Sequence, residues 1–210
     1  MDTNTIINLI LLVVVVIAAG VSLFLFIRSR NNKKQNAGNG SAKAGTGEPL
    51  RDKKANEAFA RKLKSAAWKR GLPLVIPNPE KSPFLGLLVS PAGVTAFYGA
   101  DYSGTVYGGT DEQWAQIQDG VRRPFRNPML VAEDARKALR DDLTAAKFGA
   151  FLVSAKVVMT APKAELVIPR NTPVSSMKDV LHDVEYSTDL MANRRVDEEA
   201  VKKFLEEKYL

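Results

Sequence analysis

The chain has 210 residues, a formal net charge of +7 at neutral pH, no cysteine and one histidine. The absence of cysteine excludes disulfide bonds, thiolate metal sites and a cysteine nucleophile. With His182 as the single histidine, we expect neither a cluster of histidine metal ligands nor a serine–histidine catalytic triad. His182 stands beside Asp183, and we expect it at the surface.

The positive charge is concentrated in one part of the chain. Residues 28–70 contain 13 Lys or Arg and 3 Asp or Glu, whereas residues 71–210 contain 17 and 19. Because the larger part is near neutral, the net charge does not indicate a nucleic-acid-binding domain with its own basic face. The residues after position 50 are numerous enough for one domain with a hydrophobic core.

An uncharged and almost wholly apolar stretch runs from Ile6 to Ile27. As a helix it would be about 33 Å long, enough to cross a bilayer core of about 30 Å. No Lys or Arg precedes Arg28, and the apolar run is longer than the core of a signal peptide. We therefore predict a retained single transmembrane helix over residues 6–27.

Four basic residues follow the predicted span directly, namely Arg28, Arg30, Lys33 and Lys34. The positive-inside rule places such a cluster in the cytoplasm, so residues 1–5 are expected outside the cell membrane and the rest inside. Two roles are open for these side chains. They either bind anionic lipid phosphates, at about 1 kcal/mol per residue near the surface, or serve only as a topology signal and solvated tether.

Residues 28–50 predict a basic flexible linker, because they are rich in Gly, Asn, Ser and Lys and offer little apolar surface to bury. Its part at 31–49 would span about 25 Å as a random coil. We expect the folded domain over residues 51–210. It begins with a helix at 52–69, which has an alanine-rich stripe and is basic on its other faces. Such a helix could lie on a membrane, but because the stripe is small and alanine-rich we expect it to pack onto the domain.

The next part of the chain predicts strands and turns. The turn Ser90-Pro91-Ala92-Gly93 separates two apolar runs, which indicates a hairpin. Residues 110–126 are polar, and we predict no helix or strand there. Trp114 and Phe125 are expected to anchor this segment to the domain. In chain order we predict a proline-rich loop at 73–83 and strands at 84–89, 94–98 and 105–107.

The C-terminal part predicts three helices and two strands. Asn127 and Pro128 indicate a helix start, Ser175 or Ser176 a cap for a short helix through His182, and Asp197 a cap for the last helix. Apolar runs at 150–158 and 164–168 predict strands. The order αβββαββαα indicates a mixed sheet flanked by helices, of class α/β or α+β.

The stretch LGLLVSPAGVTAFYGADYSGTVYGG, followed by FRNPM and a helix, resembles the nuclease-related domain (NERD) family of the restriction-endonuclease-like, PD-(D/E)XK superfamily. The resemblance starts near Asn56-Glu57 and continues through Asn127-Pro128 to the strand at 164–168. It implies a restriction-endonuclease-like domain. It also implies two acidic residues that hold Mg²⁺, and a lysine that helps to activate water.

The same resemblance locates the catalytic positions in this chain. The family's Asp falls at Leu85, its Glu at Tyr98 and its Lys at Ala100, and the Gln after the Asn-Pro helix start falls at Val131. None of these side chains can supply a carboxylate or an ammonium. The resemblance therefore implies a catalytically degenerate domain without metal or cofactor, and we expect Leu85, Tyr98 and Ala100 to converge on one dry spot.

Glu57 and Asp101 are the acidic residues that remain near the degenerate site. We expect Glu57 to cap or pair on its helix and Asp101 to make an Asx-type turn. The alternative is a nuclease with a rearranged active site, in which these two carboxylates would hold Mg²⁺.

Two other groups of side chains are expected around this place. Five aromatic residues either fill the former cleft, which we favour, or stack on bases or a ligand; they are Tyr98, Tyr102, Tyr107, Trp114 and Phe125. Three arginines form a basic knot that either holds a phosphate or acidic partner or is a solvated loop; they are Arg122, Arg123 and Arg126.

Three functional hypotheses follow. The first is a binding or scaffolding module, held at the cytoplasmic face of a membrane, that recruits a protein partner or tethers nucleic acid through its basic segment. The second is a metal-dependent nuclease with a rearranged site. The third is a component of a membrane-embedded transfer or secretion machine.

Overall fold

The computed structural model describes residues 43–44, 48–149, 151–188, 190 and 197–210. Residues Ala44–Leu210 belong to one compact unit, which is the part described below. The predicted span at 6–27 and its basic flank lie outside the described residues. Within the part that is described, no helix is both long enough and apolar enough to cross a bilayer.

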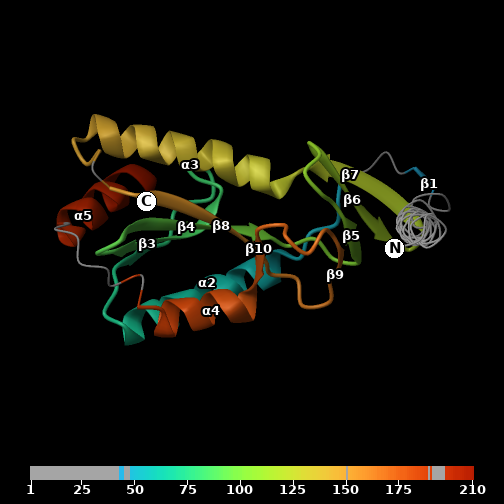
Figure 1. Ribbon diagram of the computed structural model, residues 1–210, viewed down its shortest axis with the longest axis horizontal. Helices are drawn as coiled ribbons and strands as arrows, with labels where there is room; N and C mark the ends of the chain where they lie inside the picture. Colours follow the sequence, from blue (N-terminus) through green and yellow to red (C-terminus); the bar gives the residue numbers. More distant parts are fainter. Residues whose placement is uncertain (1–42, 45–47, 150, 189, 191–196) are drawn as a thin grey trace, which may run out of the picture. The chain divides into compact units, whose positions relative to one another are not determined.

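Helices and strands are mixed along the described chain (Figure 1). In order they are β1 (Lys43–Ala44), α2 (Lys53–Lys69), β2 (Leu74–Val75), β3 (Phe84–Ser90), β4 (Gly93–Ala100), β5 (Thr105–Tyr107), β6 (Gln113–Gln118), β7 (Val121–Arg126), α3 (Pro128–Ala145), β8 (Val153–Met159), β9 (Glu165–Val167), β10 (Val174–Ser176), α4 (Met177–Tyr186) and α5 (Glu198–Tyr209). The predicted class, mixed sheet structure flanked by helices, is confirmed. The prediction of one sheet is wrong, because the strands form two.

The central sheet has the strand order β10-β8-β4-β3-β2. Its strands β10, β8 and β4 are parallel, whereas β4, β3 and β2 are antiparallel. The predicted hairpin around Ser90–Gly93 is confirmed. Gly93 has a φ of 133°, and a Cβ there would lie 2.2 Å from the Leu152 carbonyl oxygen, so the turn requires glycine.

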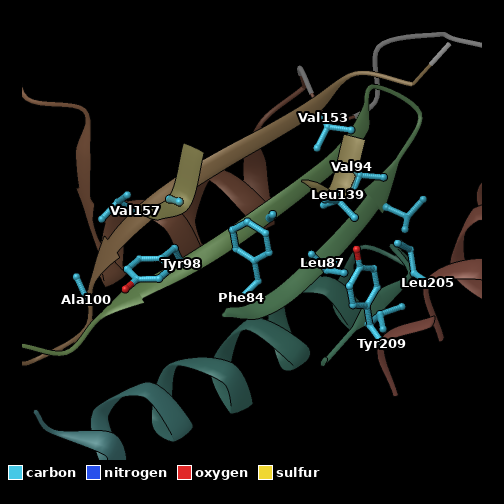
Figure 2. Close-up of a cluster of buried hydrophobic side chains, with 14 of the residues drawn as sticks. Phe84, Leu87, Val94, Tyr98, Ala100, Leu139, Val153, Val157, Leu205 and Tyr209 are labelled. Atoms are coloured by element: carbon cyan, nitrogen blue, oxygen red, sulfur yellow. The ribbon is translucent and has the colours of Figure 1, made fainter. Parts of the chain in front are cut away.

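Two helices cover each face of the central sheet, and every residue of β4 is therefore buried. Helices α3 and α5 pack on one face and α2 and α4 on the other (Figure 1). Figure 2 shows the core beneath α3 and α5, with Tyr98 and Ala100 at one end and Leu205 and Tyr209 at the other. The alanine stripe of α2 packs onto the domain as predicted, through Ala55, Phe59, Leu63, Ala66 and Ala67.

The second sheet contains β7, β6, β5 and β9 in that order. Residues 110–126 supply its β6–β7 hairpin, so the prediction of no regular element there is wrong. The turn residues Asp119 and Gly120 have φ of 54° and 72°, the type I′ geometry that suits the twist of two adjoining strands. Trp114 and Phe125 are buried and anchor the hairpin as expected.

The predicted helix starts at Asn127-Pro128 and Asp197 are confirmed, and Ser176 rather than Ser175 caps α4. Helix α4 continues past the predicted end at His182 to Tyr186. Each cap side chain accepts a hydrogen bond from a main-chain N–H of the first turn, which satisfies one of the donors that a helix start leaves free. The caps are Asp52, Asn127, Ser176 and Asp197.

A carboxylate joins the C-terminal helix to α3. Asp142 accepts a hydrogen bond of 2.6 Å from the Tyr209 hydroxyl and forms an ion pair with Lys208. Burial alone raises the pKa of Asp142, but the hydrogen bonds from Lys208 and Tyr209 outweigh burial and lower the pKa. The charged form of Asp142 therefore stabilises the packing of α5 on the sheet.

We expect Asp142→Asn to lower the free energy of unfolding by about 1–2 kcal/mol at neutral pH, because a charge-assisted contact is lost. Since the folded-state pKa is depressed, the wild-type contribution is present above about pH 4 and is lost as the pH falls through the folded-state value. Urea unfolding at neutral and acidic pH measures both effects. Exposed Asp141→Asn is the control, and an equal loss in that variant would contradict the assignment.

Candidate functional site

The structure does not bring the predicted catalytic positions together. Tyr98 and Ala100 face the core beneath α3 (Figure 2), and Val131 packs against the same core. Leu85 lies on the opposite face of the sheet, among the residues packed around α2. The expected convergence of Leu85, Tyr98 and Ala100 is therefore wrong.

A β-bulge and strand alternation explain this difference. Phe84 pairs with Tyr98 but Gly86 pairs with Phe97, so Leu85 is the extra residue of a bulge. Side chains alternate along β4, and Gly99 is the residue that faces α2. A Cβ on Gly99 would lie 2.3 Å from Leu85 Cδ1 and 2.4 Å from Asn56 Oδ1. The glycine thus allows α2 to approach the end of β4 closely.

A pocket of about 510 Å³ lies between α2, the proline-rich segment and the start of β3. It brings together the two predicted acidic residues, Glu57 and Asp101, together with Lys53. Its apolar wall consists of Ala60, Ile76, Pro77, Pro79, Pro83, Phe84 and Leu85. We refer to it as the α2–β3 pocket.

Asp101 is committed to an ion pair within this pocket. Its carboxylate accepts a hydrogen bond of 2.5 Å from Arg51 Nε, and Asp101 is 1% exposed whereas the Arg51 side chain is 42% exposed. Burial lowers the pKa of Arg51, but the hydrogen bond and charge of Asp101 outweigh it and raise the pKa. The expected Asx-type turn of Asp101 is replaced by this long-range pair.

A buried glutamine holds the segment that carries Arg51. Gln116 is fully buried, and its amide accepts from the Leu50 N–H at 2.7 Å and donates to the carbonyl oxygens of Leu50 and Ser103 at 2.8 and 2.6 Å. The Asp52 N–H donates to the Asp101 carbonyl oxygen at 2.8 Å. These contacts fix Arg51 beside Asp101. Neither Arg51 nor Gln116 is a predicted site residue, because Arg51 meets Asp101 across 50 positions of the chain and Gln116 meets Leu50 across 66.

The acidic pair does not fit Mg²⁺. The ion requires near-octahedral oxygen ligands, but Asp101 is held by a guanidinium and Glu57 is exposed on α2. The nearby charges of Arg51 and Lys53 oppose a cation in the same pocket. Within the described ranges, no group of three or more His, Asp or Glu is arranged to hold a metal ion. Asp52 rather than Glu57 caps α2.

The predicted aromatic group fills the core rather than lining a cleft. Tyr102 stacks on Phe125 with ring centroids 3.9 Å apart, and Trp114 meets Phe125 at 6.4 Å. Burial raises the pKa of both Tyr98 and Tyr102. Four of the five rings are buried, and Tyr107 is half-buried. The four buried rings are therefore not available to stack on a base.

The three arginines of β7 do not form one knot. Alternation along the strand separates Arg123 from Arg122 and Arg126. Arg126 forms an ion pair of 2.6 Å with Asp134, and Arg122 is exposed. Among the described residues, Arg123 Nη1 is buried without a hydrogen-bond partner. His182 is exposed, as predicted.

No family model, curated protein or solved structure matches this chain. The resemblance to the NERD family therefore remains a prediction from the motifs of the sequence.

We expect Arg51→Met to lower the free energy of unfolding by about 2 kcal/mol, because it leaves a buried carboxylate without its counter-charge. Urea unfolding of Arg51→Met, Asp101→Asn and the double variant gives the coupling energy of the pair. The matched control is Arg61→Met, since Arg61 is exposed on helix α2, which follows the segment of Arg51. If the loss of unfolding free energy in the double variant equals the sum of the losses in the two single variants, the ion pair is contradicted.

Proposed function

We propose that the chain is a membrane-anchored binding or scaffolding protein. In this proposal a single helix over residues 6–27 holds the domain at the cytoplasmic face of a cell membrane, and the domain is a NERD-like fold without nuclease activity. The observation that carries the proposal is the Arg51–Asp101 pair. In this pair Arg51 neutralises Asp101, the one buried carboxylate of the α2–β3 pocket. No pair of acidic side chains in the pocket is then free to hold a catalytic metal.

The shape and chemistry of the α2–β3 pocket support a binding role. Seven of its thirteen lining residues are apolar, with a few polar groups at the side of α2. Concave sites of this kind bind small ligands or the inserted side chains of a partner. Three prolines, Pro77, Pro79 and Pro83, stiffen one wall and lower the entropy cost of binding. A protein partner is the occupant that agrees best with a scaffolding role.

A nuclease with a rearranged site is the second candidate. Its support is that Glu57, Asp101 and Lys53 line the same pocket. For this candidate to hold, Arg51 must leave Asp101 before Mg²⁺ can bind. Nucleic-acid tethering within a membrane transfer machine has its only support in the 13 Lys or Arg of residues 28–70.

A cleavage assay separates the binding protein from the nuclease. The full chain in detergent is incubated with single- and double-stranded DNA and RNA in the presence of Mg²⁺ or Mn²⁺. We expect no cleavage. Cleavage that Asp101→Asn or Glu57→Gln abolishes, and that the exposed-acid control Asp111→Asn retains, would contradict the proposal.

Cysteine labelling tests the proposed topology, because the chain has no cysteine of its own. We expect a membrane-impermeant maleimide to label Thr3→Cys in intact cells. Ser41→Cys and Thr110→Cys should be labelled only after the cells are permeabilised. Labelling of Thr110→Cys in intact cells would show that the orientation is the opposite of the proposed one. Labelling of all three variants without permeabilisation would argue against a transmembrane helix between residue 3 and residue 41.

A further inference from the structure

The outer face of α2 is basic and ends in an exposed tryptophan. Lys54, Arg61, Lys64 and Trp68 recur at spacings of three, four or seven residues and thus share one side of the helix. All four are exposed, and Trp68 is 81% exposed. The stripe from Lys54 to Trp68 is about 21 Å long at 1.5 Å per residue. We call these four residues the α2 outer stripe.

The stripe is not explained by the stability of the domain. Helix α2 contains six Lys or Arg and one Glu, and its first turn holds Lys53 and Lys54 without an acidic residue. A helix start favours negative side chains, so these lysines oppose the helix dipole. Among the ion pairs of the described residues, none involves Lys54, Arg61 or Lys64. Tryptophan is highly buried on average in folded proteins, whereas Trp68 is 81% exposed.

A second exposed aromatic residue lies near the end of the stripe. Helix α4 lies beside α2 (Figure 1), and Lys69 Nζ contacts Glu185 Oε1 at 2.8 Å. Arg70 Nη1 also donates to the Glu185 carbonyl oxygen at 2.6 Å. The next residue, Tyr186, is 64% exposed. Two amphipathic rings thus stand at the same end of the helix pair.

We propose that the α2 outer stripe, with Trp68 and Tyr186 at its end, docks the domain on anionic phospholipid. Lys and Arg near an anionic surface contribute about 1 kcal/mol each. Trp and Tyr favour the boundary between lipid phosphates and acyl chains, because each has an apolar ring and a polar tip. The inference rests on the proposed membrane location. The predicted linker, with a span of about 25 Å as a random coil, would keep the local concentration of the domain at the membrane high, so a weak contact would be sufficient.

The arrangement fits a lipid surface better than a nucleic acid. Binding of single strands uses aromatic rings interleaved with basic groups along a groove. Here the charges lie along the outward side of one helix and the rings are gathered at one end. A plane of anionic lipid phosphates with an accessible apolar layer complements both parts.

Tryptophan fluorescence tests the docking directly, because the chain has only Trp68 and Trp114 and the latter is 1% exposed. The full chain is reconstituted into vesicles of phosphatidylcholine alone or mixed with phosphatidylglycerol, with lipids brominated near the polar end as quenchers. A Trp68→Phe variant gives the Trp114 background. We expect a blue shift and quenching of Trp68 in the anionic vesicles only, and loss of most of the quenching at high salt.

The matched variants change the same charges at the same spacing on two helices. Arg61→Glu with Lys64→Glu reverses the α2 outer stripe, whereas Lys137→Glu with Arg140→Glu reverses exposed charges on α3, which packs on the opposite face of the sheet. We expect the first pair to lose most of the quenching and the second pair to retain it. Equal losses in the two pairs would overturn the proposed surface.

Vesicle flotation distinguishes failure of the docking from failure of the anchor. A chain that floats with both vesicles while Trp68 stays unquenched overturns the docking alone. A chain that floats with neither vesicle overturns the anchor and the docking together. Equal quenching in neutral and anionic vesicles overturns the electrostatic recognition. A shift of Trp68 with duplex DNA but not with anionic vesicles overturns the proposal in favour of nucleic acid.

Discussion

The ion pair between Arg51 and Asp101 joins the segment before α2 to the end of β4. A carboxylate as buried as Asp101 is costly to desolvate unless a counter-charge and hydrogen bonds compensate it. Arg51 can compensate it only because Gln116 and the Asp52 N–H hold its segment in place. The position of α2, and therefore one wall of the α2–β3 pocket, depends on this group of contacts.

The central sheet makes that position possible. Gly99 removes the side chain that would separate β4 from α2, and Gly86 does the same where Leu63 packs against β3. Helix α2 can then bury its alanine-rich stripe, which leaves its basic side in water. Helix α2 thus supplies a wall of the pocket and the outer stripe, and the segment before it supplies the counter-charge Arg51. Both candidate surfaces, for a partner and for lipid, therefore include residues of α2.

Local sequence signals predicted local structure well. The turn before Gly93 and the caps Asn127 and Asp197 were found because their chemistry lies within a few residues. The type I′ turn at Asp119 and Gly120 carries an equally local signal, an Asp-Gly pair between alternating residues, but the polar flanks hid it. The bulge at Leu85 depends on tertiary packing, and so do two long-range hydrogen bonds. Arg51 and Asp101 are 50 positions apart in the chain, and Gln116 and Leu50 are 66 positions apart. No spacing in the sequence indicates them.

Asp101 is paired with Arg51, and we infer that it does not hold a metal ion. Paramagnetic broadening by Mn²⁺ tests this inference, with amide resonances of the full chain followed by NMR in micelles. We expect weak, non-saturating broadening at exposed acidic residues and none that is specific to Asp101 and Glu57. Saturable broadening of both these amides, competed by Mg²⁺ and lost in Asp101→Asn, would contradict the account.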